Sequence, residues 1–258
     1  MKLYFKYFNI HMKSDLQYKV SFICSFISNF LVFFGYYFTI VCLFDKFSNI
    51  GGFTLYEVLL AFGVMQFGFT FCEIFFRGVD HFDELICRGD FDRLLLRPVG
   101  IIHQIMCEEI DLSKLARLIQ AIIIIIIAVI HLGIALDISK IIILLLMLIS
   151  AVILYLCIFI IAAAYCFYTI KGLEARNVLL YGSREAAQYP IGVFGKKIIF
   201  FFTFVLPFGL VNYYPLLYLV GRSNNKLFMI CPLIAVVYII PSLLIFYHGM
   251  KKYKSVGS

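Results

Sequence analysis

Residues 117–136 read RLIQAIIIIIIAVIHLGIAL, and only Arg117, Gln120 and His131 in this run are polar. A helix needs about 20 apolar residues to cross the hydrocarbon core of a bilayer. The chain is 63% hydrophobic and 14% charged, a composition that soluble globular domains do not have. We therefore predict an all-α polytopic membrane protein with a single domain over residues 1–258. Its six predicted transmembrane helices are 20–44, 55–77, 117–136, 140–170, 198–220 and 227–250.

The distribution of Lys and Arg predicts how the spans are oriented. If both termini are cytosolic, only Lys46, Lys140, Arg222 and Lys226 of the 22 basic residues face outward, and the other 18 face the cytosol. Cytosolic loops of membrane proteins carry such an excess of positive charge. We therefore predict a multi-pass protein with a cytosolic N-terminus and C-terminus. The net charge of +7 then reflects orientation and contact with the lipid bilayer, not nucleic-acid binding.

Residues 1–19 precede the first span and have an amphipathic pattern. Lys2, Lys6, Asn9 and Lys13 recur at the spacing of one helical face, and apolar residues occupy the other side. This pattern predicts an interfacial helix that lies in the headgroup plane. A disordered basic tail is the alternative.

The fifth predicted span contains two prolines. Pro207 and Pro215 bracket a segment that includes Gly209 and Asn212. Proline removes a helix hydrogen bond and disfavours the α conformation in the residue before it. We expect the helix to break near Pro207 and to continue as an outer half-helix, and we assign Pro207, Gly209, Asn212 and Pro215 to the outer part of a transport path. An ordinary proline kink is the alternative.

Chemistry-bearing motifs are absent from the rest of the sequence. There is no Walker A motif, no metal-binding motif among the eight Cys, and no hydrolase motif. Few ionisable residues lie inside the spans, which argues against ion-coupled transport and favours an apolar or amphipathic substrate. Asn29, Gln66 and Gln120 are predicted to form hydrogen bonds between helices. We expect a non-enzymatic chain with no cofactor or metal of its own.

The longest polar loop, residues 78–116, carries the strongest functional signal. Acidic and basic residues alternate from Asp83 to Arg97, three leucines form an apolar edge, and Pro98 ends the element. A second short amphipathic helix is predicted over 101–114. An element of mixed charge and exposed leucine favours docking of a partner protein, with a solvated connector as the alternative. The predicted docking residues are Glu84, Arg88, Gly89, Asp90, Asp92, Arg93, Leu94, Leu95, Leu96, Arg97 and Pro98.

This loop also carries a family resemblance. Residues 89–98, GDFDRLLLRP, resemble the G-x-h-D-x-L-L-L-R-P segment of ABC-2 type transporter permeases, in particular the six-span branch found beside daunorubicin-type exporter genes. Residues 189–191 (YPI), 204–207 (FVLP), 213–218 (YYPLLY) and 252–257 (KYKSVG) are similar to further motifs of that branch. The sequence departs from the branch at Leu216, where Ala is common, and at 195–197, where aromatic and Arg residues are usual.

The resemblance implies a fold, partners and a location. The fold would be the transmembrane domain of an ABC-2 (type V exporter-like) transporter, in a bacterial plasma membrane. It would pair with a second permease, of the same or a paralogous chain, and dock a separate ABC ATPase subunit that binds ATP and Mg. Exported substrates of such proteins include drugs, lipids, glycolipids and peptides. The alternative is a stand-alone secondary transporter without an ATPase partner.

Overall fold

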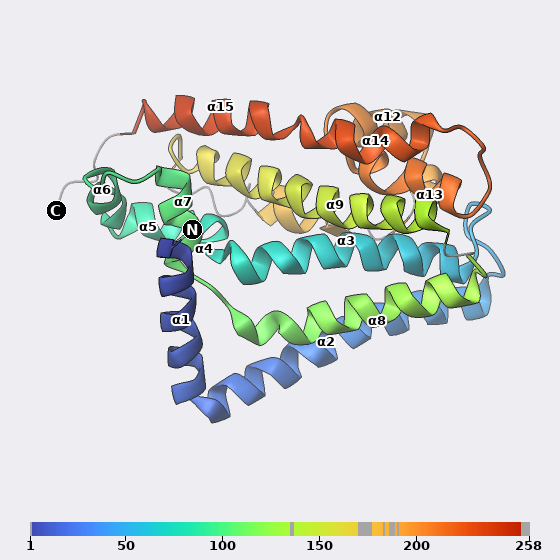
Figure 1. The fold of residues 1–258 in the computed structure, drawn as a ribbon, viewed down its shortest axis with the longest axis horizontal. Coiled ribbons are helices and arrows are strands. Elements are labelled where there is room, and N and C mark those ends of the chain that lie inside the picture. The colour runs from blue at the N-terminus through green and yellow to red at the C-terminus, as the bar shows by residue number, and fades with distance from the viewer. Residues whose placement is uncertain are drawn as a thin grey trace.

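Long apolar helices lie side by side in one bundle (Figure 1). This computed structural model describes residues 2–134, 137–169, 177–182, 184–185, 189 and 191–253. Within these residues, five stretches are long and apolar enough to cross a membrane. They are α2 (Lys19–Lys46), α3 (Leu55–Phe75), the 3₁₀ turn η1 (Leu112–Lys114) with α8 (Leu115–His131), α9 (Ile138–Tyr165), and α14 (Leu227–Val236) with α15 (Ile239–Met250).

Helix α3 is the centre of the bundle. In the most apolar stretch of α3, 83% of the residues are buried, whereas only 11% are buried in the corresponding stretch of α2. Small residues let the neighbouring backbones approach it closely. A Cβ atom on Gly68 would lie 2.7 Å from Ala151 of α9, and one on Gly63 would lie 2.7 Å from Ile125 of α8. Helix α2 is mostly exposed and buries only Phe33 and Ile40.

The predicted fifth span is a broken helix. Helix α12 (Lys196–Phe204) is followed by a π-helical turn, η4 (Gly209–Tyr213), and by α13 (Tyr214–Leu219), and the two parts are bent by 92°. Pro207 lies in the break, so the structure has a break here and not a simple kink. The bundle has six spans if this bent pair counts as one. Helices α12, α13 and α14 lie at the end opposite to α4–α7 (Figure 1).

Helix α1 (Lys2–Gln17) runs across the end of the bundle and not along the spans (Figure 1). Tyr4, Phe8 and Met12 recur every four residues and pack near Ile74 and Ile110. The Tyr4 hydroxyl also donates a hydrogen bond of 2.8 Å to the carbonyl of Phe75. The predicted helix therefore exists, and its apolar side contacts the bundle. Its position in the headgroup plane stays a prediction.

Four short helices connect α3 to η1 at the same end. They are α4 (Arg77–Asp80), α5 (Phe82–Cys87), α6 (Asp90–Leu95) and α7 (Ile101–Glu108). The predicted helix over 101–114 is wrong in its length, because α7 ends at Glu108 and the next residue is extended. Asp111 then caps η1 by accepting a hydrogen bond of 3.1 Å from the backbone N–H of Ser113. Because the Asp111 side chain caps the first turn of η1, a new helix begins here and α7 does not continue.

Candidate functional site

Helix α6 sorts the three leucines of the loop into buried and exposed positions. Gly89 precedes the helix with a φ of +72°, a left-handed conformation that glycine adopts without strain. From this start Phe91 and Leu94, three residues apart, face inward and are fully buried. Leu96 is 87% exposed and Leu95 is 40% exposed. The predicted three-leucine edge therefore has two members, and Leu94 anchors the helix.

Phe91 is the centre of an aromatic cluster that joins α6 to the spans. Its ring lies 5.1 Å from Phe82 of α5, 5.5 Å from Phe167 after α9, and 5.0 Å from Tyr253 after α15. Phe82 and Phe246 of α15 are 5.7 Å apart. Edge-to-face aromatic pairs at these separations are favourable and leave little room for sliding. A displacement of α6 would therefore be transmitted to the ends of α9 and α15.

Gln104 holds the turn that follows the leucines, and sequence reasoning missed it. This buried side chain donates hydrogen bonds from Nε2 to the carbonyls of Leu94, at 3.2 Å, and Val99, at 2.7 Å. Pro98 lies between these two carbonyls in the chain. The sequence feature that could have indicated its role is a single amide side chain beside Ile101 and Ile105 on an otherwise apolar helix face.

Ion pairs of the predicted docking residues surround a groove at this end of the bundle. Arg88 pairs with Glu84 at 2.7 Å, and Arg93 lies 3.5 Å from both Asp90 and Glu108. The groove beside them has a volume of about 290 Å³ and is lined by acidic and basic groups, including four of these five residues. Its mixed charge suits a partner that presents charges of both signs.

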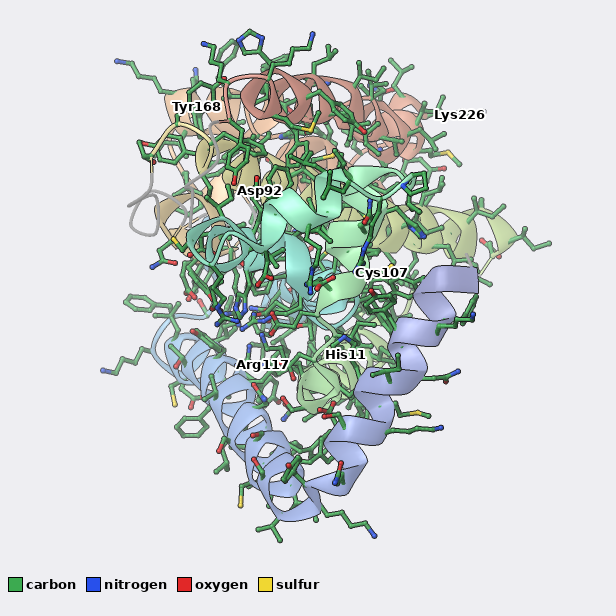
Figure 2. All side chains as sticks on the ribbon, turned by 90° about the vertical axis from the view of Figure 1, so that its left-hand side faces the viewer. His11, Asp92, Cys107, Arg117, Tyr168 and Lys226 are labelled. Carbon is green, nitrogen blue, oxygen red and sulfur yellow. The ribbon has the colours of Figure 1, made fainter. Side chains whose placement is uncertain are left out.

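The outermost part of the loop faces away from the bundle. Figure 2 views this end of the bundle, with Asp92 of α6 labelled, and this side chain is half-buried. Arg97 follows and donates a hydrogen bond of 3.3 Å to the Tyr7 hydroxyl, which links the loop to α1. We call the exposed residues Leu95, Leu96 and Val99, together with Arg93 and Arg97, the loop surface.

A buried ion network lies below the loop. Glu73, whose side chain is 3% exposed, lies 2.8 Å from Lys114, 3.2 Å from Arg117 and 3.5 Å from Arg77. Arg77 in turn pairs with Asp80 at 2.9 Å. Buried charges persist only where opposite charges compensate them. The network therefore fixes the end of α3 relative to α4, η1 and α8.

A second pair joins α4 to the end of α7. His81 Nδ1 lies 2.9 Å from a Glu109 carboxylate oxygen, and Arg77 lies 3.9 Å from the same group. Burial raises the pKa of Glu109, but the hydrogen bond and charge of His81 and the charge of Arg77 outweigh burial and leave this pKa below its usual value. A Cβ on Gly78 would lie 2.1 Å from the carbonyl of Ile105, so α4 and α7 touch through their backbones.

The opposite end of α3 has its own ion pair. Arg222 donates from Nε to Glu57 at 2.7 Å, and its guanidinium lies 4.7 Å from the Phe53 ring. The other Glu57 oxygen accepts a hydrogen bond of 2.7 Å from the backbone N–H of Thr54. Two residues 165 positions apart thus close this end of the bundle.

The four residues assigned to the transport path are all buried within the chain: Pro207, Gly209, Asn212 and Pro215. Asn212 donates a hydrogen bond of 3.2 Å to the carbonyl of Ala61 in α3. A Cβ on Gly209 would lie 2.7 Å from the Ile191 side chain. These contacts make the broken helix part of the core, and its role in a path stays a prediction.

The predicted interhelical hydrogen bonds are present. Asn29 donates to the Ser113 hydroxyl at 3.2 Å, and Gln120 donates to the carbonyl of Phe30 at 3.3 Å. Gln66, near the middle of α3, accepts a hydrogen bond of 3.2 Å from Arg184 Nε. The charge distribution assigns Arg184 to a cytosolic loop, and the structure adds that its side chain is only 5% exposed and lies against α3. Lys171, Arg176, Pro190 and 254–257, which entered the charge count or the family resemblance, lie outside the described residues.

A family model described as "ABC-2 family transporter protein" matches residues 30–257, which include the loop surface and most of every span. No curated protein matches the chain. No solved structure matches it either.

Proposed function

The chain belongs to the ABC-2 transporter family, and from this premise we propose that it is the permease subunit of an ATP-driven exporter. In this proposal a separate ABC ATPase subunit binds ATP and Mg and hydrolyses the nucleotide. The chain itself contributes the membrane path and does no chemistry. A second permease, identical or paralogous, completes the path.

The loop surface carries this proposal. Its three apolar members are 40%, 87% and 40% exposed in chain order, although they lie at a polar end of the molecule. Exposed apolar side chains bordered by arginines are typical of protein-binding surfaces. The charge-lined groove next to them offers complementary contacts for a partner. We infer that the ATPase subunit docks here.

The packing beneath the loop surface supports coupling between docking and transport. Leu94 and Phe91 are fully buried, and Phe91 contacts Phe167 and, through Phe82, Phe246. Nucleotide-driven movement of a docked ATPase would therefore act on the ends of α9 and α15. Close-packed aromatic groups transmit such movements because they cannot be compressed.

Topology and location follow from charge and geometry. Helix α1, the loop surface and Tyr253, which follows α15, lie at one end of the bundle (Figure 1). Helix α1, the stretch from Arg77 to Arg117 and the pair Lys251 and Lys252 carry 11 of the 22 basic residues, against four assigned to the opposite side, so we place this end in the cytosol of a bacterial cell. The exposed apolar face of α2 would contact lipid or the second permease.

A pull-down with defined variants tests the docking proposal. Leu96→Asp and Arg97→Glu should each release the ATPase subunit during affinity purification, with membrane insertion retained. Truncating a buried charged contact costs about 2–5 kcal/mol, which is enough to lose a complex during washing. Lys13→Glu, a charge reversal on an exposed residue of α1, is the matched control and should retain the ATPase. Equal recovery of the ATPase by all three variants would refute docking at the loop surface.

A further inference from the structure

Arg184 is a guanidinium buried at the middle of the bundle. Its side chain is 5% exposed, and its Nε donates to Gln66, which lies near the midpoint of α3. The guanidinium also lies 5.0 Å from the Tyr36 ring of α2 and 4.8 Å from the Phe69 ring. A cation at this depth is costly, and such residues mark functional sites in membrane proteins. Its location therefore needs a chemical reason.

Arg184 has no acidic partner among the residues that the structure describes. Glu73, a buried acid of the same helix α3, pairs with Lys114 at 2.8 Å and Arg117 at 3.2 Å. Glu57, at the other end of α3, pairs with Arg222. Both acidic residues of α3 thus form their short ion pairs with other cations, although the Glu73 carboxylate also lies within electrostatic reach of Arg184. The aromatic rings and the Gln66 oxygen stabilise the guanidinium but do not neutralise it.

Four buried polar atoms at this place have no hydrogen-bond partner within the described part of the chain. They are Arg184 Nη2, Gln66 Nε2, Thr70 Oγ1 and Tyr155 Oη. Thr70 follows Gln66 by one helical turn and lies on the same side of α3. Tyr155 of α9 packs on Phe69 with ring centroids 5.2 Å apart, and its hydroxyl lies within electrostatic reach of both the Arg184 guanidinium and the Glu185 carboxylate. Unpaired polar groups are rare in buried positions, so this concentration points to a ligand.

The chemistry of these four atoms defines the ligand. The guanidinium and amide nitrogens only donate hydrogen bonds, and the two hydroxyls can donate. A set of donors around a guanidinium that forms no salt bridge within the described part of the chain fits an anionic oxygen group, and arginine binds carboxylate and phosphate through paired hydrogen bonds. The aromatic rings of Tyr36, Phe69 and Tyr181 border the same place, with Phe69 and Tyr181 6.2 Å apart. Tyr36 is half-buried and Tyr181 is exposed, so the site lies close to the surface on the α2 side.

We propose that Arg184, Gln66, Thr70 and Tyr155 bind the carboxylate or phosphate group of an amphipathic substrate at mid-depth of the bundle. The inference rests on the proposed function, since it specifies the substrate class of the exporter. The apolar part of the substrate lies along the aromatic rings and the exposed face of α2. The site gives the exporter a preference for anionic over neutral or cationic amphiphiles.

Equilibrium binding to the full-length chain in phosphatidylcholine nanodiscs tests the site. The probes share a dodecyl chain and are radiolabelled dodecanoate, dodecyl phosphate, dodecanol and dodecyltrimethylammonium, with empty nanodiscs as the background. We expect saturable binding of at least one anion and none of the other two probes. Arg184→Gln should weaken anion binding about 10- to 100-fold, as loss of a charge-assisted hydrogen bond does. The anion that binds identifies carboxylate or phosphate as the preferred group.

Two further variants separate binding from folding. Gln66→Glu places a carboxylate beside Arg184 Nε, so it should preserve the fold and still abolish anion binding, because the guanidinium is then neutralised internally. Lys226→Gln removes an equal charge from an exposed position and should bind anions as the unmodified chain does. The proposal is overturned if neither anion binds saturably, if dodecanol binds equally well, or if Gln66→Glu retains anion affinity. None of these measurements involves ATP or the ATPase, so their failure would leave the docking proposal intact.

Discussion

Neutralising Glu73 should destabilise the protein strongly, because this residue compensates three cations at once. In Glu73→Gln, Lys114 and Arg117 lose partners at 2.8 and 3.2 Å, and their side chains are only 8% and 14% exposed. Removing one partner of a buried ion pair costs about 3–5 kcal/mol. For a protein of this size each kcal/mol lowers the melting temperature by about 2–4 °C, so the expected decrease is about 6–20 °C.

The buried thiols of Cys72 and Cys157 provide the assay for this variant. Once the accessible Cys24, Cys42 and Cys87 are replaced by Ser, a thiol-reactive fluorogenic dye labels the remaining thiols when the bundle opens, so fluorescence against temperature reports unfolding in detergent. Glu84→Gln is the matched control, because Glu84 is 49% exposed and its partner Arg88 is 70% exposed. Exposed pairs contribute about 0–1 kcal/mol. Melting temperatures of the two variants that agree within 2 °C would refute the role assigned to the buried network.

Three further predictions concern packing and pH. Leu94→Ala should lower stability by about 2–5 kcal/mol and Leu96→Ala by much less, since only Leu94 is buried, and the same dye assay compares them. Gly68→Ala should lower the melting temperature and separate α3 from α9, because its Cβ would meet Ala151 at 2.7 Å, and equal stability would contradict the packing described. The lowered pKa of Glu109 stabilises the fold at pH above its ordinary value and ceases to do so as pH falls through the lowered value. A Glu109→Gln variant should therefore lose less stability than the unmodified chain between neutral and acidic pH, as measured by melting at several pH values.

The sequence was informative wherever local physics decides the structure. Apolar length predicted the spans, and the described helix Leu227–Met250 coincides with the predicted sixth span. Pro207 predicted the break in the fifth span, because a missing N–H acts on the helix itself. The match over residues 30–257 confirmed the family that the loop motif indicated.

Features that depend on tertiary packing were not predictable in the same way. Which leucine of residues 94–96 points inward depends on where α6 begins, and Gly89 sets that point through its backbone conformation. The sequence around Arg184 has the composition of a cytosolic loop. Its burial against Gln66 therefore becomes visible only in the three-dimensional path of the chain. The partner carbonyls of Gln104 are likewise fixed by the turn at Pro98 and not by any periodicity.

Photo-crosslinking from position 96 tests the central claim most directly. With p-benzoylphenylalanine in place of Leu96 in cells, irradiation should join the chain to one protein that contains a Walker A motif, identified by mass spectrometry. The same probe in place of the exposed Leu244 of α15 is the control and should give no such product. A crosslink from position 96 to lipid alone, or to proteins without a nucleotide-binding motif, would contradict docking of an ATPase on the loop surface.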